Sequence, residues 1–587
     1  MAKKEVAAPV KGEGPASLLE HFWGLGLSAV LLGVIYPVLG WWWLAYVALV
    51  PGALVVSRSA SFWRVLWVSV VVFWVWWVVM LNWVMPVTVG GTIAMGLVLS
   101  VFPAVGFLLI RRLSVGGGGR LALTWAVPIA WVLVEFLRSR LPFGGLSWFF
   151  LGHSQGPWLP EHSAVLIQTA DLFGELTVTA FVALLNGFAA DVIRRSFTAP
   201  DPEVVQERLR KRFVARVVSV GVVVALVVGH GWLWTDHARY GLASTTGVVV
   251  IQTNEPQSNR QSPSLEDRIG YWHALLDETR LAVEGQRDES GRLVVIWPES
   301  AVPMPIDAGT LAMAEQEGWA AITAIEGQIR DLAVSYGVDL LVGAPSYGTW
   351  ETVDLDGVAR WLPGEGANSV FHYRSDGSRA AERYDKMHRV PFGEYLPLVD
   401  GWPWLKGLVL KYLTPYETSY TIEAGDAPVV FEVAGWSVVT PICFEDTVGR
   451  VVREMVRVAR EALDRPALLV NVTNDGWFGS ASQGFQHLQV AAFRCVENRV
   501  PMAKAANTGV SGFISSLGEV VSIVEVDGES KGVQGHASMS LGPRLNPPHV
   551  STWHGLYEVW GETPLVLLAV VVGWLGSGGR RGASSES

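Results

Sequence analysis

The sequence predicts a protein in two parts, a polytopic α-helical membrane domain of about eight spans and an α/β domain. Half of the 587 residues are hydrophobic, only 17% are charged and 28 are tryptophan, a composition typical of membrane proteins. Apolar runs of spanning length recur through the first 235 residues. From about 245 to 535, short apolar strands alternate with helical stretches, which is typical of an α/β layered domain.

Eight apolar runs are expected to form the spans. Seven lie in an N-terminal membrane domain assigned to residues 1–235, at 17–36, 40–56, 62–82, 91–110, 121–137, 164–193 and 213–234. The eighth begins near Pro564 in a C-terminal segment, 556–587, and the α/β domain takes residues 236–555 between them. No small-residue cleavage site follows the polar N-terminus, so the first run is expected to remain as an anchor.

Basic residues in the connections predict the orientation. They gather before the first run and after the fourth, sixth and eighth, as Lys3, Lys4, Arg111, Arg112, the connection 193–216, Arg580 and Arg581. If successive runs cross the membrane in alternating directions, all of these basic residues fall on the same side of it. The positive-inside rule identifies that side as the cytoplasm. Both termini should then be cytoplasmic and the α/β domain should lie outside. Arg138 and Arg140 are exceptions, because they fall on the outer side.

The α/β domain is expected to contain strands that end in turns or polar clusters. These strands are predicted at 247–254, 292–300, 339–346, 437–446 and 467–475. Helices are predicted at 264–286 and 447–463, and the stretch 511–526 is typical of a hairpin. Reactive groups in such domains gather at the ends of the strands.

Composition and spacing exclude several classes of function. Two cysteines, Cys443 and Cys495, cannot make a disulfide framework or a Cys-rich zinc site. A formal net charge of −10 gives no reason to expect nucleic-acid binding. His153, His388 and His487 lack ligand spacing, so we expect no metal and no cofactor, and expect His487 to orient a loop or helix start.

Three polar residues, Glu299, Lys386 and Cys443, form a chemically complete set for acyl transfer. A thiol is a nucleophile only as thiolate, which needs a base or a positive neighbour. A carboxylate can accept the thiol proton, and an ammonium can favour the thiolate and stabilise an oxyanion. Each residue also has a structural interpretation, because a buried cysteine is commonly a core residue, a glutamate can cap a helix and a lysine can be solvated. Cys495 is expected to be core.

The joint pattern is more specific than its parts. The stretches WPES (297–300), YDKMHRVPFGEYLP (384–397) and ICFED (442–446) together resemble the carbon–nitrogen hydrolase (nitrilase) superfamily. Within it, LNWV (81–84), the stretch 135–155, NDGWFG (474–479) and NTGVSGFI (507–514) resemble the apolipoprotein N-acyltransferase family. The resemblance covers nearly the whole chain and implies a nitrilase-like αββα sandwich for the α/β domain.

The resemblance also implies roles for individual residues. It implies Glu299 as general base, Lys386 as the partner of the thiolate and oxyanion, and Cys443 as nucleophile. Supporting or substrate-binding roles are implied for Glu394, Tyr395, Phe444, Glu445 and Trp477. Glu445 and Asp446 are expected to form a polar wall beside the thiol. Lys386 is expected to offset their unfavourable effect on the thiolate.

Two positions depart from the family pattern. Phe444 stands where the family often has tyrosine, and Gln261 stands where it often has tryptophan, for which Trp272 is a candidate substitute.

The function implied is acyl transfer from a membrane phospholipid, through a thioester on Cys443, to the N-terminal amine of a diacylglyceryl-modified cysteine on a lipoprotein. The location implied is the bacterial inner membrane, with the catalytic domain facing the periplasm, and we expect a monomer. The nearest alternative is a membrane-tethered amidase acting on small amides, but eight spans exceed what a tether needs. The intact Glu299, Lys386 and Cys443 argue against a non-catalytic lipid binder. A transporter is disfavoured because the predicted spans contain little charge apart from Asp171 and Glu175.

Overall fold

The computed structural model describes most of the chain. The described ranges are 15–37, 39–115, 121–196, 203–236, 246–256, 264–286, 291–355, 358–397, 402–413, 421–463, 465–479, 481–542, 545–546 and 554–578. Lys3, Lys4, Gln261, Arg580 and Arg581, on which the sequence made predictions, lie outside these ranges.

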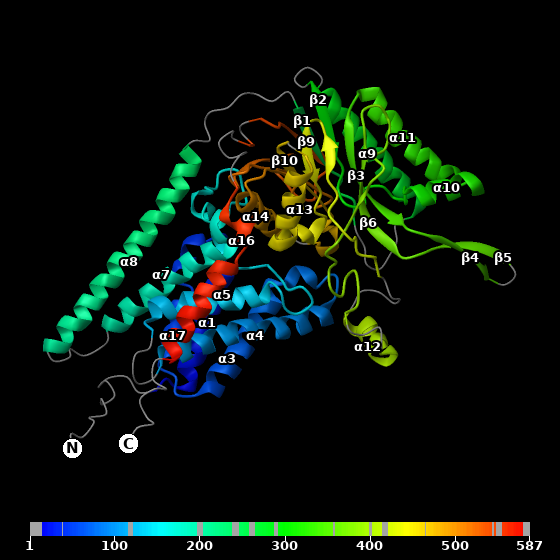
Figure 1. Ribbon diagram of the computed structural model, residues 1–587. Coiled ribbons are helices and arrows are strands. Elements are labelled where there is room, and N and C mark those ends of the chain that lie inside the picture. Colours follow the sequence, from blue (N-terminus) through cyan, green and yellow to red (C-terminus); the bar gives the residue numbers. More distant parts are fainter. Residues whose placement is uncertain are drawn as a thin grey trace.

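The first part of the chain folds as a group of packed helices, which the last helix joins (Figure 1). These helices are α1 (Leu18–Val34), α2 (Val50–Ser57), α3 (Phe62–Met80), α4 (Val89–Ser114), α5 (Leu123–Arg138), α6 (Ala170–Phe173), α7 (Glu175–Ser196), α8 (Glu203–Asp236), α16 (Leu556–Trp560) and α17 (Thr563–Gly578). Within the described residues, four helical segments are long and apolar enough to cross a membrane: Phe62–Met80, Val89–Ser114, Glu175–Ser196 and Arg210–Thr235. Shorter apolar helices occur at Leu18–Val34, Trp42–Ser57 and Thr563–Leu575.

All eight predicted runs contain helix, but two differ from the prediction. The run 40–56 is not one helix, because a 3-10 turn (Trp42–Tyr46) precedes the eight-residue α2. Eight residues span about 12 Å, which is too short to cross a bilayer. The run 164–193 is broken at Gly174, whose φ of +75° separates α6 from α7. The break allows Asp171 and Glu175 to bind Arg499 and Arg494 of the α/β part.

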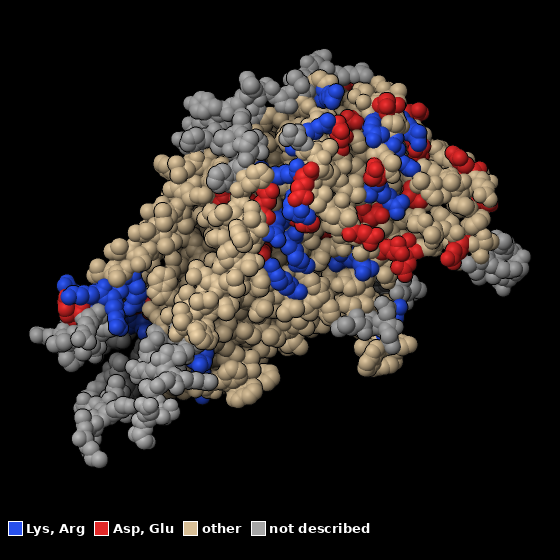
Figure 2. Space-filling model, viewed as in Figure 1, with Lys and Arg blue, Asp and Glu red and all other residues tan. Residues whose placement is uncertain are grey.

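The surface divides by charge as a membrane protein requires. Figure 2 shows acidic and basic side chains spread over the α/β part, whereas the helical part is almost bare except at one end. Large apolar side chains are exposed along the helices, among them Trp23, Trp63, Trp67, Trp232 and Trp574. Arg111 and Arg112 lie in the last turn of α4, and Arg194 and Arg195 in the last turn of α7.

The two exceptions to the basic-loop pattern have partners at the opposite end of the helices. The Arg138 guanidinium donates to the carbonyl oxygens of Trp148 (2.5 Å) and Phe149 (3.2 Å). Arg140 forms an ion pair with Glu562 at 2.8 Å. These arginines hold a loop and a helix start, so their presence on this side has a structural cause.

The α/β part is a sandwich of two six-stranded sheets. The first has the order β14-β1-β2-β3-β6-β7 and the second β13-β12-β11-β10-β9-β8. The strands are β1 (Thr246–Gln252), β2 (Arg292–Ile296), β3 (Asp339–Tyr347), β6 (Gly366–Tyr373), β7 (Tyr384–Asp385), β8 (Phe431–Val433), β9 (Trp436–Val439), β10 (Ala467–Thr473), β11 (Met502–Ala506), β12 (Gly512–Ile514), β13 (Val520–Ile523) and β14 (Gly535–Ser540). A separate ribbon, β4 (Trp350–Leu355) with β5 (Val358–Pro363), projects from the sandwich (Figure 1).

Helices cover the outer faces of both sheets. They are α9 (Leu265–Glu284), α10 (Ala308–Glu317) and α11 (Ala320–Tyr336) on the first sheet, and α13 (Gly449–Ala462) and α14 (Ala481–Asn498) on the second, while α12 (Pro403–Leu413) lies apart (Figure 1). Alternation along β1 explains the layering, because Val248 and Val250 face the second sheet and Val249 and Ile251 face α9. β1, β2 and β3 run parallel, as do β9, β10 and β11. The predicted strands, helices and hairpin of this part are present, and the αββα arrangement is confirmed.

Candidate active site

Cys443 stands at the turn that follows β9 and opens a 3-10 helix, Cys443–Thr447. Its φ is +51°, a left-handed conformation that costs about 1–3 kcal/mol in a residue with a side chain. The turn is held by Asn471 of β10, whose amide nitrogen donates to the carbonyl oxygens of Pro441 (3.1 Å) and Cys443 (3.2 Å). The thiol residue is partly exposed, so a substrate can reach it.

Glu299 follows β2 and is 7% exposed. The side-chain amide of Asn368 donates to its Oε1, and the backbone N–H of Asn474 donates to its Oε2 at 2.7 Å. Close approach of β3 requires a glycine at Gly343, because a Cβ there would lie 2.2 Å from the carbonyl oxygen of Pro298. The carboxylate is therefore fixed by donors from two separate segments, β6 and the turn after β10.

Lys386 follows β7 and is completely buried. Its Nζ donates to Glu394 Oε1 at 2.6 Å and lies 3.8 Å from Glu299 Oε1. The other oxygen of Glu394 accepts from the backbone N–H of Val390 at 2.7 Å. Glu394 thus holds the lysine and closes its loop.

The electrostatics favour a neutral thiol at rest. Burial raises the pKa of Cys443 above its ordinary value, the Glu299 charge raises it further, and Lys386 opposes both. Burial alone would lower the pKa of Lys386, but Glu394, Glu299 and Cys443 together raise it. Burial raises the pKa of Glu299, and Lys386 again opposes this. The arrangement suits a carboxylate base that takes the thiol proton when substrate arrives.

Glu445 and Asp446 do not form the expected polar wall around the thiol. Buried Glu445 accepts from the backbone N–H groups of Met387 and His388 (2.8 Å each) and of Ile442 (2.7 Å). Burial raises the pKa of Glu445 to about 7. The carboxylates that raise the Cys443 pKa are Glu299 and Asp475 instead. Glu445 joins the nucleophile turn to the lysine loop, which is a supporting role of a different kind.

Asp446 points into a second buried cluster behind Cys443. It accepts from Lys504 Nζ at 3.0 Å and pairs with His487 Nε2 at 2.6 Å. His487 also reaches Asp475 Oδ1 at 3.2 Å. Although burial opposes it, Asp446 raises the pKa of His487 to about 9. His487 therefore orients the start of α14 and the adjoining loop, as predicted.

The remaining predicted residues lie toward the helical part. Phe444 stacks on His388, with ring centroids 6.1 Å apart, and packs against the core of the helical part. The Tyr395 hydroxyl donates to the carbonyl of Phe143 at 3.5 Å. Trp477 is partly exposed in the turn Asp475–Phe478. Trp272 does not serve as a substitute for the family tryptophan, because it lies on the buried face of α9 and packs against Trp297, with ring centroids 5.7 Å apart.

Sequence reasoning missed Asn368, Asn471 and Lys504. Asn368 and Asn471 sit within strands β6 and β10, where no motif distinguishes them from other polar strand residues. Lys504 is fully buried in β11, so a charged residue inside an apolar strand was the available signal. Among the described residues, no group of three or more His, Cys, Asp or Glu side chains is arranged to hold a metal ion.

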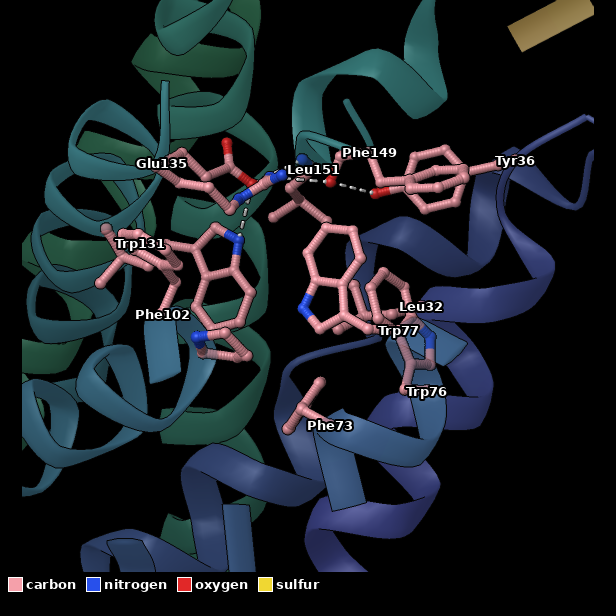
Figure 3. Close-up of a pocket in the computed structure, with 13 residues that line it drawn as sticks. Leu32, Tyr36, Phe73, Trp76, Trp77, Phe102, Trp131, Glu135, Phe149 and Leu151 are labelled. Atoms are coloured by element: carbon pink, nitrogen blue, oxygen red, sulfur yellow. Dashed lines mark hydrogen bonds between the residues drawn. The ribbon is translucent and has the colours of Figure 1, made fainter. Parts of the chain in front are cut away.

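A cavity of about 30 Å³ lies within the helical part, away from this site (Figure 3). Aromatic side chains line it, together with Glu135, which accepts from Trp131 Nε1 at 3.0 Å. Its volume is enough to hold a water molecule.

The fold and the Glu–Lys–Cys cluster define a protein of the carbon–nitrogen hydrolase class, and the family described as "Carbon-nitrogen hydrolase" matches residues 257–537. The family described as "Apolipoprotein N-acyltransferase N-terminal domain" matches residues 28–188. Apolipoprotein N-acyltransferase of Geobacter metallireducens is 30% identical over 84% of this chain and 85% of its own length. That of Methylococcus capsulatus is 30% identical over 83% and 80%. The chain belongs to the apolipoprotein N-acyltransferase family.

A third relative and a solved structure complete the comparison. Apolipoprotein N-acyltransferase of Allorhizobium ampelinum is 27% identical over 96% of this chain and 89% of its own length. A mutant of the Nesterenkonia AN1 amidase from the nitrilase superfamily is 15% identical, covers 54% of this chain and 95% of its own, and has a TM-score of 0.34. The protein is thus a membrane-bound acyltransferase with a nitrilase-superfamily domain.

Proposed function

We propose that the protein transfers an acyl chain from a membrane phospholipid to the N-terminal amine of an S-diacylglyceryl-cysteine on apolipoproteins. Cys443 attacks an ester carbonyl of the phospholipid and gives a thioester and a lysophospholipid. The lipoprotein amine then attacks the thioester and releases the thiol. The observation that supports this most is the convergence of Glu299, Lys386 and the partly exposed Cys443 beside Phe444, which packs on the helical part.

Each residue has one task in both steps. Glu299 accepts the thiol proton and gives it to the departing lysophospholipid oxygen. It then accepts the proton of the incoming amine and returns it to the Cys443 sulfur. Lys386 and the backbone N–H of Phe444 stabilise the oxyanion of each tetrahedral intermediate. Glu394 holds Lys386 in place at 2.6 Å.

The helical part gives the acyl chains an apolar place to lie beside the thiol. Moving a chain through water would cost about 0.8 kcal/mol for each CH₂ exposed. We propose that the enzyme spans the bacterial inner membrane as a monomer, with both termini cytoplasmic and the domain 236–555 in the periplasm. The basic ends of α4 and α7 support this orientation. Reporter fusions after Ser196 and within 398–401 should report opposite sides of the membrane.

Mass spectrometry of the purified enzyme mixed with phospholipid tests the proposed chemistry. We expect an added acyl mass on Cys443, which disappears when a diacylglyceryl lipopeptide with a free amine is supplied. Hydrolysis of small amides without an acyl adduct from phospholipid would favour a tethered amidase instead.

A further inference from the structure

A row of arginines lies along one face of α13. Its members are Arg450, Arg453, Arg457 and Arg460, spaced three and four residues apart, as neighbours on a helix surface are. Figure 2 shows basic side chains gathered on the visible face where α13 and α16 meet the helical part.

The two ends of this row differ in their partners. Arg457 pairs with Glu454 at 2.6 Å and with Glu461 at 2.7 Å, and Arg460 pairs with Glu558. Within the described part of the chain, Arg450 and Arg453 form no ion pair. Both donate to carbonyl oxygens, and the Arg453 guanidinium also lies over the Tyr557 ring, 5.7 Å from its centroid. Arg450 donates to Ser139 at 3.3 Å and to Gly144 at 3.4 Å, and Arg453 donates to Tyr557 at 3.4 Å. These bonds are long, and a guanidinium carries five N–H donors, so both arginines retain capacity for an anion.

The location of Arg450 and Arg453 is the level at which lipid headgroups are expected. Their carbonyl acceptors lie just beyond the end of α5 at Arg138 and just before the start of α17 at Thr563. The pKa of Arg450 is lowered, mainly by burial and next by the positive charge of Arg140, which is therefore a third cation close by. Arg140, Arg450 and Arg453 are three cations with two neighbouring carboxylates, Glu562 beside Arg140 and Glu454 beside Arg453. A phosphate would stabilise their excess positive charge.

The same loop links this face to the nucleophile. Gly144, which Arg450 binds, packs so closely on His388 that a Cβ there would lie 2.6 Å from the ring. His388 in turn stacks on Phe444, the residue after Cys443. We propose that Arg450 and Arg453 bind the phosphate group of the phospholipid donor and so direct its ester toward Cys443. This inference rests on the proposed function and adds the residues that select a phosphate-bearing donor.

The test compares two acyl donors that differ in the phosphate. Full-length enzyme in vesicles is supplied with a phospholipid or with a diacylglycerol carrying the same chains, and the rate of Cys443 acylation is measured for each. In the Arg450→Gln/Arg453→Gln variant, the preference for the phospholipid should fall about tenfold or more. The matched control, Arg457→Gln on the same helix, should keep the wild-type preference. Arg450→Lys keeps the positive charge but loses the paired N–H donors of the guanidinium. Its preference for the phospholipid should lie between those of the double variant and the wild type.

Three outcomes would overturn the inference. The first is an unchanged preference for the phospholipid in the double variant. The second is an equal slowing of acylation with both donors, which would indicate a structural role. The third is competition by inorganic phosphate that exceeds competition by chloride at equal ionic strength, which would indicate a site for free phosphate. A non-cleavable ether phospholipid gives a second readout without catalysis, and the double variant should bind it about tenfold more weakly. If the wild type forms no acyl adduct from either donor, the proposed function fails. If the adduct forms and the preference is unchanged, only this inference fails.

Discussion

Two buried charge clusters in this molecule contain similar residues but differ in how their charges are paired. The seam cluster, where α7 meets α14, consists of His153, Glu175, Arg494 and Glu497. Arg494 lies 2.5 Å from Glu175 and 3.0 Å from Glu497, and all four side chains are nearly inaccessible. In the catalytic cluster, Lys386 is bound to Glu394 at 2.6 Å but lies 3.8 Å from Glu299.

The difference shows what separates a structural cluster from a reactive one. In the seam cluster, Arg494 contacts both Glu175 and Glu497 directly and His153 contacts Glu175, so the buried polar groups are paired with one another. In the catalytic cluster, Glu299 is held by Asn368 and Asn474 but is not neutralised by direct contact with the lysine. It faces a partly exposed thiol whose pKa is raised. Both clusters are buried and charged. Only the catalytic cluster combines a residue that substrate can reach with a carboxylate available to accept a proton.

The largest effect is expected at the nucleophile. Cys443→Ala should abolish the acyl adduct and the product, because no other described residue of the cluster carries a thiol. Cys495→Ala is the matched control, since Cys495 is fully buried in α14, and it should leave turnover largely intact. Intact-mass measurement after incubation with phospholipid checks both, and an adduct on the Cys443 variant would refute the assignment.

Removing the base should have the next largest effect, about 10²–10⁴-fold near neutral pH. Glu299 acts only when ionised, and its raised pKa places the acid limb of the rate profile above the ordinary carboxyl range. Glu299→Gln removes that limb and also the charge that raises the Cys443 pKa. The variant's rate should therefore climb with pH as the thiol ionises. Single-turnover acylation from pH 6 to 9 measures this, and a flat profile would contradict the assigned role.

Lys386→Met should slow acylation and transfer alike, by about 10²–10³-fold, because both steps pass through an oxyanion. The lost charge lowers the pKa of both Glu299 and Cys443 in the wild type, so both values should rise in the variant. High pH should rescue it much less than Glu299→Gln. Equal rescue of the two variants, measured in the same pH series, would mean that the division of roles is mistaken.

The comparison also explains what the sequence could predict. Glu299, Lys386 and Cys443 lie in contiguous motifs. Strand periodicity placed Glu299 and Cys443 at strand ends, and the structure brings both together with Lys386. Sequence reasoning missed Asn368 and Asn471 because their contacts depend on how separate strands pair, which the local sequence pattern does not encode.

In the helical part, hydropathy located the apolar runs but not the breaks within them. The break at Gly174 places Glu175 and Asp171 against Arg494 and Arg499, more than 300 residues away in the chain, and local hydropathy does not report such contacts. The role of Glu445 was misread for a similar reason. Its carboxylate is bound by backbone groups of the lysine loop, which lies 57 and 58 residues earlier in the chain.

The smallest effect on the chemistry is expected at the seam cluster. Arg494→Met removes the cation between Glu175 and Glu497 and leaves both carboxylates buried, which should cost about 3–5 kcal/mol of stability. The pH–rate profile per folded molecule should not change, because none of these groups contacts the catalytic cluster. Thermal unfolding in detergent measures the loss, with the exposed Arg457→Gln as control. Adding Glu175→Gln to Arg494→Met should recover part of it, since one unpaired charge is removed. A shifted pH–rate profile in Arg494→Met, or stability equal to the wild type, would show that the two clusters are not separate in the way proposed here.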